Sequence, residues 1–115
     1  MTDNKGPEKY WEFYDTHTRW YILKHRKPVP CYDMCKVNKG LNFRNKRVRR
    51  TYLPNNVFVS TVFLGLDHRY GSGPPLLFET MIHADGEFIE YQTRCSTWRQ
   101  ALKMHWAAVE IAKDD

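Results

Sequence analysis

Acidic residues are absent from the middle of this sequence. Residues 34–66 contain no Asp or Glu, and from Lys24 to Arg50 ten Lys and Arg residues accompany a single acid, Asp33. Four of the thirteen acids lie within residues 79–90, while the whole chain has a formal net charge of +5. Charges that are segregated along a chain can create separate surface potentials. We therefore expect a molecule with one cationic side and one carboxylate-rich side.

Long apolar runs and a regular cysteine framework are also lacking. No run approaches the roughly 20 apolar residues of a membrane-spanning helix, and residues 1–20 hold no segment of signal-peptide type. We therefore expect a cytoplasmic protein without membrane contact. The three cysteines are an odd, sparse set, which argues against disulfides. Cys31 and Cys35 could form half a zinc site, but no CxxC or HxxxH pattern supplies further ligands, so we expect structural thiols, no metal and no cofactor.

The hydrophobic content predicts one globular domain. Hydrophobic residues make up 42% of the 115 residues and aromatic residues 15%, which is more than a disordered chain contains. Residues 1–9 are polar and predict a flexible tail, leaving residues 10–115 as a single domain. The aromatic segment YWEFY, residues 10–14, favours either a helical turn or an arm packed on the domain.

Hydrophobic periodicity predicts strands, two helices and the turns between them. The expected strands are residues 19–24, 46–53, 57–66, 76–83 and 87–94, and the expected helices are residues 31–39 and 98–113. Residues 57–66 are apolar on both faces and indicate the central strand. Residues 28–30, Pro-Val-Pro, are expected to be an extended connector. The fold class is therefore α+β, an antiparallel sheet of four to five strands with two helices packed on one face.

Both expected helices carry end signals. For the first helix, Pro30 is suited to open it, Asp33 falls in its first turn, and Gly40 follows its end. For the second helix, Thr97 and Gln100 form a capping-box pattern. Its apolar positions share one helical face: Trp98, Ala101, Leu102, His105, Val109 and Ala112.

Four polar side chains are candidates for chemistry: Asp67, His68, Glu79 and His105. A His near carboxylates can act as a general base or bind a metal. Asp67 and His68 are adjacent at the end of a strand, however, where neighbours point to opposite faces, and no nucleophile or P-loop motif is present. The favoured interpretation is structural: a core His105 bonded to Asp67, Glu79 or a backbone carbonyl, and a turn organised by His68.

The segment DHRYGSGPPL, residues 67–76, predicts a structured hairpin loop. Gly71 and Gly73 allow positive φ angles, and the two prolines stiffen the return. Arg69 and an exposed Tyr70 would suit partner binding, because Tyr and Arg are enriched at interface hot spots. A purely structural turn is the alternative.

A basic tract carries the strongest physical signal. Its cations are interleaved with Phe43 and Tyr52: Lys36, Lys39, Arg44, Lys46, Arg47, Arg49 and Arg50. Cations neutralise phosphates and aromatic rings stack on bases, although such a tract can also be a solvated face or bind an acidic protein. Alternation along a strand would put Arg47 and Arg49 on the face opposite to Arg50.

The segment VSTVFLGLDHRYGSGPPLLFETMI, residues 59–82, resembles a signature of small uncharacterised proteins of bacteriophages, prophages and bacterial genomes. KPVPC (residues 27–31) and YQTRCSTWRQALKMHWAAV (residues 91–109) extend the resemblance over residues 21–109. The relatives carry an acidic, tryptophan-containing helix after PVPC. This chain departs from them there, since residues 41–50, LNFRNKRVRR, are strongly basic.

These features favour a small non-enzymatic binding protein. The resemblance implies a phage-type accessory protein that serves host takeover or counters a defence, as anti-CRISPR proteins do. It would act in the bacterial host cytoplasm, through its basic, aromatic-containing surface, on a protein or nucleoprotein complex. Two alternatives stay open: a nucleic-acid-binding protein that uses residues 36–50, and a small hydrolase or nucleotide-processing enzyme centred on His68 and His105. The oligomeric state is not predicted.

Overall fold

A computed structural model describes residues 19–85 and 87–113. The expected tail at residues 1–9 and the aromatic segment at residues 10–14 lie outside this part of the chain. The described elements are, in order, β1 (Tyr21–Lys24), β2 (Lys27–Pro30), α2 (Met34–Gly40), α3 (Phe43–Lys46), β3 (Arg47–Leu53), β4 (Val57–Phe63), β5 (Phe78–Ala84), β6 (Glu87–Cys95) and α4 (Trp98–Lys113).

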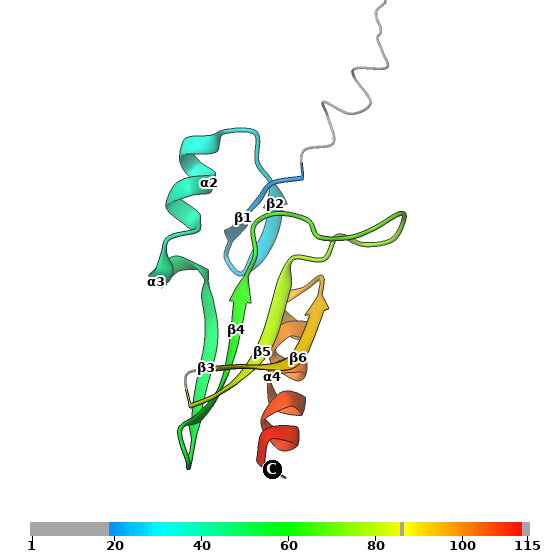
Figure 1. Ribbon diagram of the computed structural model, residues 1–115. Coiled ribbons are helices and arrows are strands. Elements are labelled where there is room, and N and C mark those ends of the chain that lie inside the picture. Colours follow the sequence, from blue (N-terminus) through cyan, green and yellow to red (C-terminus); the bar gives the residue numbers. More distant parts are fainter. Residues whose placement is uncertain (1–18, 86, 114–115) are drawn as a thin grey trace, which may run out of the picture.

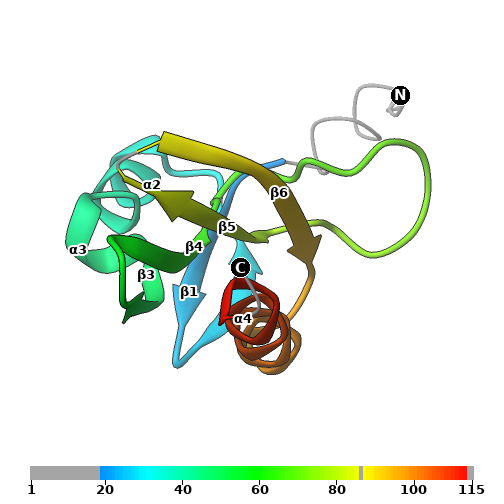
Figure 2. The ribbon, with the colours of Figure 1, turned by 60° about the horizontal axis from the view of Figure 1, so that its bottom comes forward.

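The strands β3 to β6 form the main sheet. Their order is β3-β4-β5-β6, and each neighbouring pair is antiparallel. The β-branched and aromatic residues of β4 suit a pleated strand in the sheet interior. Helix α4 packs against all four strands (Figure 1). Figure 2 views α4 nearly end-on and shows the four strands to one side of it. The expected α+β class is confirmed.

A small hairpin and α2 lie beyond one end of the main sheet (Figure 1). Residues 28–30 are extended, as expected, but they belong to a strand that pairs with β1, so their expected role as a connector was wrong. The hairpin joins the main sheet through a bridge between Trp20 and Leu66 and through the Tyr21 amide, which donates to the Gly65 carbonyl at 2.7 Å. Helix α2 packs against β1 and α3, whereas α4 covers the sheet.

The first helix begins later than its proline predicts. α2 begins at Met34, because Asp33 is its N-cap and accepts from the amides of Cys35 and Lys36 at 2.9 and 3.4 Å. The short helix α3 was not predicted. Its N-cap is Asn42, whose side chain accepts from the Asn45 amide at 2.8 Å.

Two clusters of buried side chains hold α4 against the sheet. Val59 and Ile82 pack against the second half of the helix, and Phe63 and Phe78 pack against Ala101 in the first half. Full burial of such a side chain contributes about 1.5–3 kcal/mol. The capping box is confirmed as well, since the Gln100 amide donates to Thr97 Oγ1 and the Thr97 amide to Gln100 Oε1, both at 3.1 Å.

The register of the sheet separates a covered face from an uncovered one. Thr61 bonds to His105 of α4, so Val59, Thr61 and Phe63 point toward the helix. Alternation then points the residues between them away from α4, and no described helix packs against that side. We call this side the open face. Its described side chains are Arg47, Arg50, Tyr52, Phe58, Ser60, Val62, Glu79, Met81, His83, Gln92 and Arg94.

Candidate functional site

A β-bulge in β3 decides which arginines reach the open face. Arg47 is opposite Val62, Arg49 is opposite Thr61 and Arg50 is opposite Ser60, so the register shifts between Arg47 and Arg49. An extra residue in one strand breaks the alternation of sides. Arg47 and Arg50 therefore line the same face, and the predicted pairing of Arg47 with Arg49 was wrong.

Arg50 is held among aromatic rings on the open face. Its guanidinium carbon is 5.2 Å from the Phe58 ring centre, and its NH1 group donates to the Tyr52 hydroxyl at 3.2 Å. Phe58 in turn stacks on His83, with ring centres 4.6 Å apart and planes 12° from parallel. Cation–π contact orders the guanidinium before any ligand arrives. The face therefore presents a fixed cation beside a flat aromatic stack.

A hollow of about 250 Å³ opens beside these groups. Lys46 at the end of α3 lines it together with Arg47 and Arg50, and Ser60 and Glu79 are also part of its wall. Three cations around a shallow hollow favour an anionic ligand.

Glu79 belongs to the same face as the arginines. Its Oε2 accepts from Gln92 Nε2 at 2.6 Å and from Arg94 Nε at 3.0 Å. At this position the carboxylate is not segregated from the cations, in contrast to the two-sided charge distribution that the sequence predicts.

His105 of α4 is fully buried between the helix and the sheet. Its Nδ1 lies 2.7 Å from Thr61 Oγ1 and its Nε2 lies 2.8 Å from Thr51 Oγ1, while Thr61 also contacts Thr80 Oγ1 at 2.5 Å. Burial, and secondarily the charge of Arg49, lowers the pKa of His105 below its ordinary 6.5. The predicted burial is confirmed, but the predicted partners were wrong, because the sheet supplies threonine hydroxyls instead.

Asp67 organises the loop that follows β4. Its Oδ1 accepts from the amides of Arg69 and Leu76, at 2.8 and 2.9 Å, and so joins the two sides of the loop. Its Oδ2 lies 3.0 Å from Arg69 Nε. His68 Nδ1 lies 2.8 Å from the Leu66 carbonyl oxygen. Asp67 and His68 thus bond within the loop.

The four predicted polar residues do not assemble into one site. Glu79 lies on the open face, whereas His105 lies on the covered face of the same sheet. Asp67 and His68 are engaged in the loop beyond β4. Within residues 19–85 and 87–113, no group of three His, Cys, Asp or Glu side chains is placed to hold a metal ion.

The loop presents Tyr70 to solvent. The Tyr70 side chain is 96% exposed, as predicted. Arg69 turns back instead, contacting Asp67 and the Gly73 carbonyl. Gly73 has a φ of 113°, which a side chain would strain. The loop is therefore a braced support for one exposed aromatic ring.

The remaining predicted cations are spread over other elements. Lys36 and Lys39 are exposed on α2, and Arg44 belongs to α3, where the structure describes only its backbone. Arg49 points to the covered side, with its guanidinium carbon 5.0 Å from the Trp106 ring centre. The basic tract is therefore divided among several surfaces.

The cysteines differ in environment. Cys31 is buried and its Sγ lies 3.5 Å from the Asp33 carbonyl oxygen, whereas Cys35 is exposed on α2. Cys31 precedes α2, so the two cysteines do not share the helix that the sequence predicts over residues 31–39. Burial raises the pKa of the Cys95 thiol to about 11, which disfavours its reactive thiolate at neutral pH.

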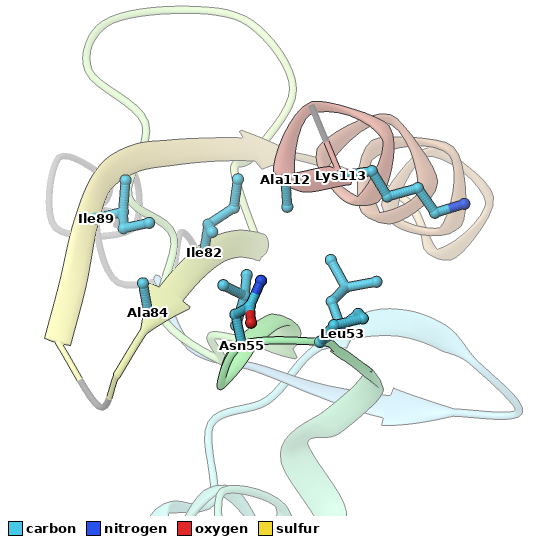
Figure 3. Close-up of a pocket in the computed structure, with 9 residues that line it drawn as sticks. Leu53, Asn55, Ile82, Ala84, Ile89, Ala112 and Lys113 are labelled. Atoms are coloured by element: carbon cyan, nitrogen blue, oxygen red, sulfur yellow. The ribbon is translucent and has the colours of Figure 1, made fainter. Parts of the chain in front are cut away.

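A second hollow, of about 360 Å³, is apolar. It lies between the β3–β4 turn, β5, β6 and the end of α4 (Figure 3). Leu53, Ile82 and Ile89 surround it, while the amine end of Lys113 extends away. Its Nζ lies 3.4 Å from Glu110 Oε2. Binding pockets combine apolar walls with convergent polar groups. This hollow has fewer such polar groups than the open face.

The fold and the open face together define an α+β protein with a helix-backed sheet and a cationic, aromatic surface. Comparison of the chain with protein-family models, with curated proteins and with solved structures gave no match. No helix in the described part of the chain is long and apolar enough to cross a membrane.

Proposed function

We propose that this protein is a non-enzymatic binding protein whose open face takes a single strand of nucleic acid, alone or within a nucleoprotein complex. One observation carries the proposal: Arg47 and Arg50 lie on the same uncovered sheet face as the stacked rings of Phe58 and His83. Proteins hold single strands with cations that neutralise phosphates and rings that stack on bases. The open face offers both groups side by side.

The sheet suits a single strand better than a duplex. The bases of a single strand are unpaired, so their flat sides can reach the exposed ring of Tyr52, which lies beside Phe58. In a duplex these sides are hidden within the stack. An acidic protein surface would use the same cations, but it would gain little from the aromatic stack. Replacement of the ring therefore separates the two partners.

Binding of a labelled oligonucleotide at several salt concentrations tests the cations. Joint replacement Arg47→Gln and Arg50→Gln should reduce the slope of log affinity against log salt by about 1.4, since each single-strand phosphate contact contributes about 0.7. The matched control is Lys24→Gln with Lys27→Gln, which removes the same charge from two exposed residues that flank the turn of the β1–β2 hairpin. Equal weakening by both pairs would contradict a site on the open face.

Phe58→Ala tests the stack. It should weaken single-strand binding about 5- to 150-fold, the equivalent of stacking one base, because the aromatic surface between Tyr52 and His83 is lost. It should leave binding of an acidic polypeptide such as polyglutamate within about twofold, since a charge contact needs no ring. Unchanged oligonucleotide binding in the folded variant would overturn the single-strand proposal. A purification from bacterial lysate, with and without nuclease, then shows whether a natural partner is held through nucleic acid.

A protein partner at Tyr70 is the second candidate function. The supporting observation is a 96% exposed aromatic ring on a loop braced by Asp67. Rigid exposed aromatics are typical interface anchors. Tyr70→Ala should leave the stability unchanged and should abolish a nuclease-resistant partner in the same purification. A partner that persists with this variant would exclude the loop as its anchor.

The biological setting that we propose is that of a phage-type accessory protein in the bacterial cytoplasm. Its support is the resemblance of residues 59–82, and nothing in the geometry bears on it. Expression in a bacterium that carries CRISPR immunity should raise the plating of a targeted phage. Unchanged plating on CRISPR-protected cells would contradict the anti-CRISPR role.

A further inference from the structure

We propose that the bound strand continues around the edge of the sheet onto a second stacking site, formed by Arg49 and Trp106. This inference rests on the proposed function of the open face and extends its ligand from a few nucleotides to a longer strand. The site would take one further base and its phosphate. Its two residues come from β3 and α4, on the covered side of the sheet.

The main observation is that two consecutive arginines are each held over an aromatic ring, on opposite sides of one strand. Arg50 lies over Phe58 on the open face at 5.2 Å, and Arg49 lies over Trp106 at 5.0 Å. The bulge before Arg49 leaves Arg49 and Arg50 on regular, alternating sides. The same arrangement of guanidinium and ring is thus repeated one residue apart.

The position of β3 connects the two sites. β3 is an end strand of the four-stranded sheet and pairs only with β4 among the described strands. Its two sides therefore meet along one outer edge. A flexible single strand can pass over such an edge, whereas a strand in the sheet interior would separate the two sides completely. A ligand seated at Arg50 needs only to cross β3 to reach Arg49.

Trp106 is suited to the role by its exposure and its support. A ring of this size is usually mostly covered, yet 44% of Trp106 is exposed. Its edge-on contact with the buried His105, at 5.1 Å between centres, fixes its position. A base stacked against the guanidinium of Arg49 would complete a base–arginine–tryptophan arrangement, in which the cation gains from both rings.

The charges around Trp106 favour a phosphate. Lys103 is exposed one turn before it on α4. The acid on this part of the helix is Glu110, whose carboxylate lies 3.4 Å from Lys113 Nζ, so its charge is partly compensated. Arg49 and Lys103 thus leave a local excess of positive charge beside the ring.

Oligonucleotide length is the variable that tests the inference. In OB-fold proteins, single-strand sites cover about 4–16 nucleotides per fold. Labelled oligothymidylates of 4 and 12 nucleotides should therefore fill the open face alone and both sites, respectively. Arg49→Gln and Trp106→Ala should each weaken binding of the 12-mer about 5- to 150-fold and change binding of the 4-mer less than about twofold. Phe58→Ala should weaken both lengths.

The chain offers a matched control. Arg26 also lies over a tryptophan, Trp98, at 5.3 Å, but it belongs to the β1–β2 turn. Arg26→Gln removes the same charge and the same kind of contact, and should change the 12-mer affinity less than about twofold. If Trp106→Ala unfolds, Arg49→Gln and the exposed Lys103→Gln still report on the site.

The outcomes separate this inference from the proposed function. If Phe58→Ala weakens binding of the 12-mer but Arg49→Gln and Trp106→Ala do not, the second site is contradicted and the proposed site on the open face stands. Equal effects of Arg49→Gln on both lengths would overturn it too, because Arg49 would then belong to the first site. Unchanged affinity of both lengths with Phe58→Ala would overturn the proposed function, and this inference with it.

Discussion

At the scale of single residues, a histidine on the apolar face of α4 is buried in the core, where threonine hydroxyl groups are its hydrogen-bond partners. A neutral imidazole donates from one ring nitrogen and accepts at the other, and Thr51 and Thr61 can serve both nitrogens. A charged imidazole would have to be buried away from water, which is costly. His105 is therefore kept neutral by its surroundings, and its interaction partners come from the sheet.

The burial of His105 predicts a loss of stability in acid. Its folded-state pKa is lowered, so the unfolded state binds the proton more readily. The contribution is fully present above the unfolded pKa of about 6.5 and is lost progressively as the pH falls below it. Urea unfolding between pH 7.5 and 5 should show this decline, and His105→Gln should reduce it. An identical pH dependence in that variant would contradict the role of His105.

Asp67 supplies a second prediction at this scale. Asp67→Ala would leave two loop amides, those of Arg69 and Leu76, without their acceptor, at a cost of about 1–3 kcal/mol. Asp67→Asn keeps an acceptor oxygen and should cost less. Urea unfolding measures both, with Glu110→Ala as the control, since its exposed ion pair contributes at most about 1 kcal/mol. Equal, small effects of all three changes would show that Asp67 does not organise the loop.

At the scale of elements, patterns with a strong period predicted the structure well. β4, β5 and α4 follow their hydrophobic periodicity and end signals. Prolines concealed β2. Pro28 and Pro30 occupy alternate pairs of the hairpin, where a missing amide hydrogen need not disturb the bonds to β1. The spacing of the prolines permits a strand there, but the pairing of that strand with β1 depends on tertiary structure and could not be predicted from the local sequence.

The candidate site was predictable in composition but not in geometry. The basic tract and Tyr52 mark the region in the sequence. The bulge that turns Arg47 toward Arg50 leaves no local signal, because Val48 reads as an ordinary strand residue. The contributions of Phe58 and His83 come from neighbouring strands. Only the register of the sheet brings these rings to the arginines.

The capping box of α4 should make a measurable contribution to the free energy of unfolding. Thr97→Ala removes the acceptor for the Gln100 amide and should cost about 1 kcal/mol, within the range of about 0.5–2 kcal/mol for such caps. The urea midpoint should fall while the slope of the transition stays constant. Thr97→Ser keeps the hydroxyl and is the matched control. A loss of equal size with serine would point to the methyl group instead of the cap.

At the scale of the whole molecule, the chain builds two unequal parts. The main sheet and α4 share two clusters of buried side chains. The β1–β2 hairpin contributes only partly buried side chains, Tyr21 and Leu23, to one of these clusters. Backbone bonds also link it and the residues before it to the loop after β4, through the Tyr21 amide to Gly65 and the Asp67 amide to Arg19. A two-stranded hairpin is only marginally stable alone, so its order depends on these few contacts and on the contact of Arg26 with Trp98.

Amide hydrogen exchange should separate the two parts. The paired hairpin residues Ile22 and Val29 should exchange faster than Val59 and Ile82, because local opening needs less free energy than global unfolding. Gly65→Ala should widen the difference. A Cβ at Gly65 would lie 2.5 Å from the Leu41 side chain, and its φ of 80° strains any larger residue. Exchange that is equally slow in the hairpin and the sheet would show that the molecule opens as one unit.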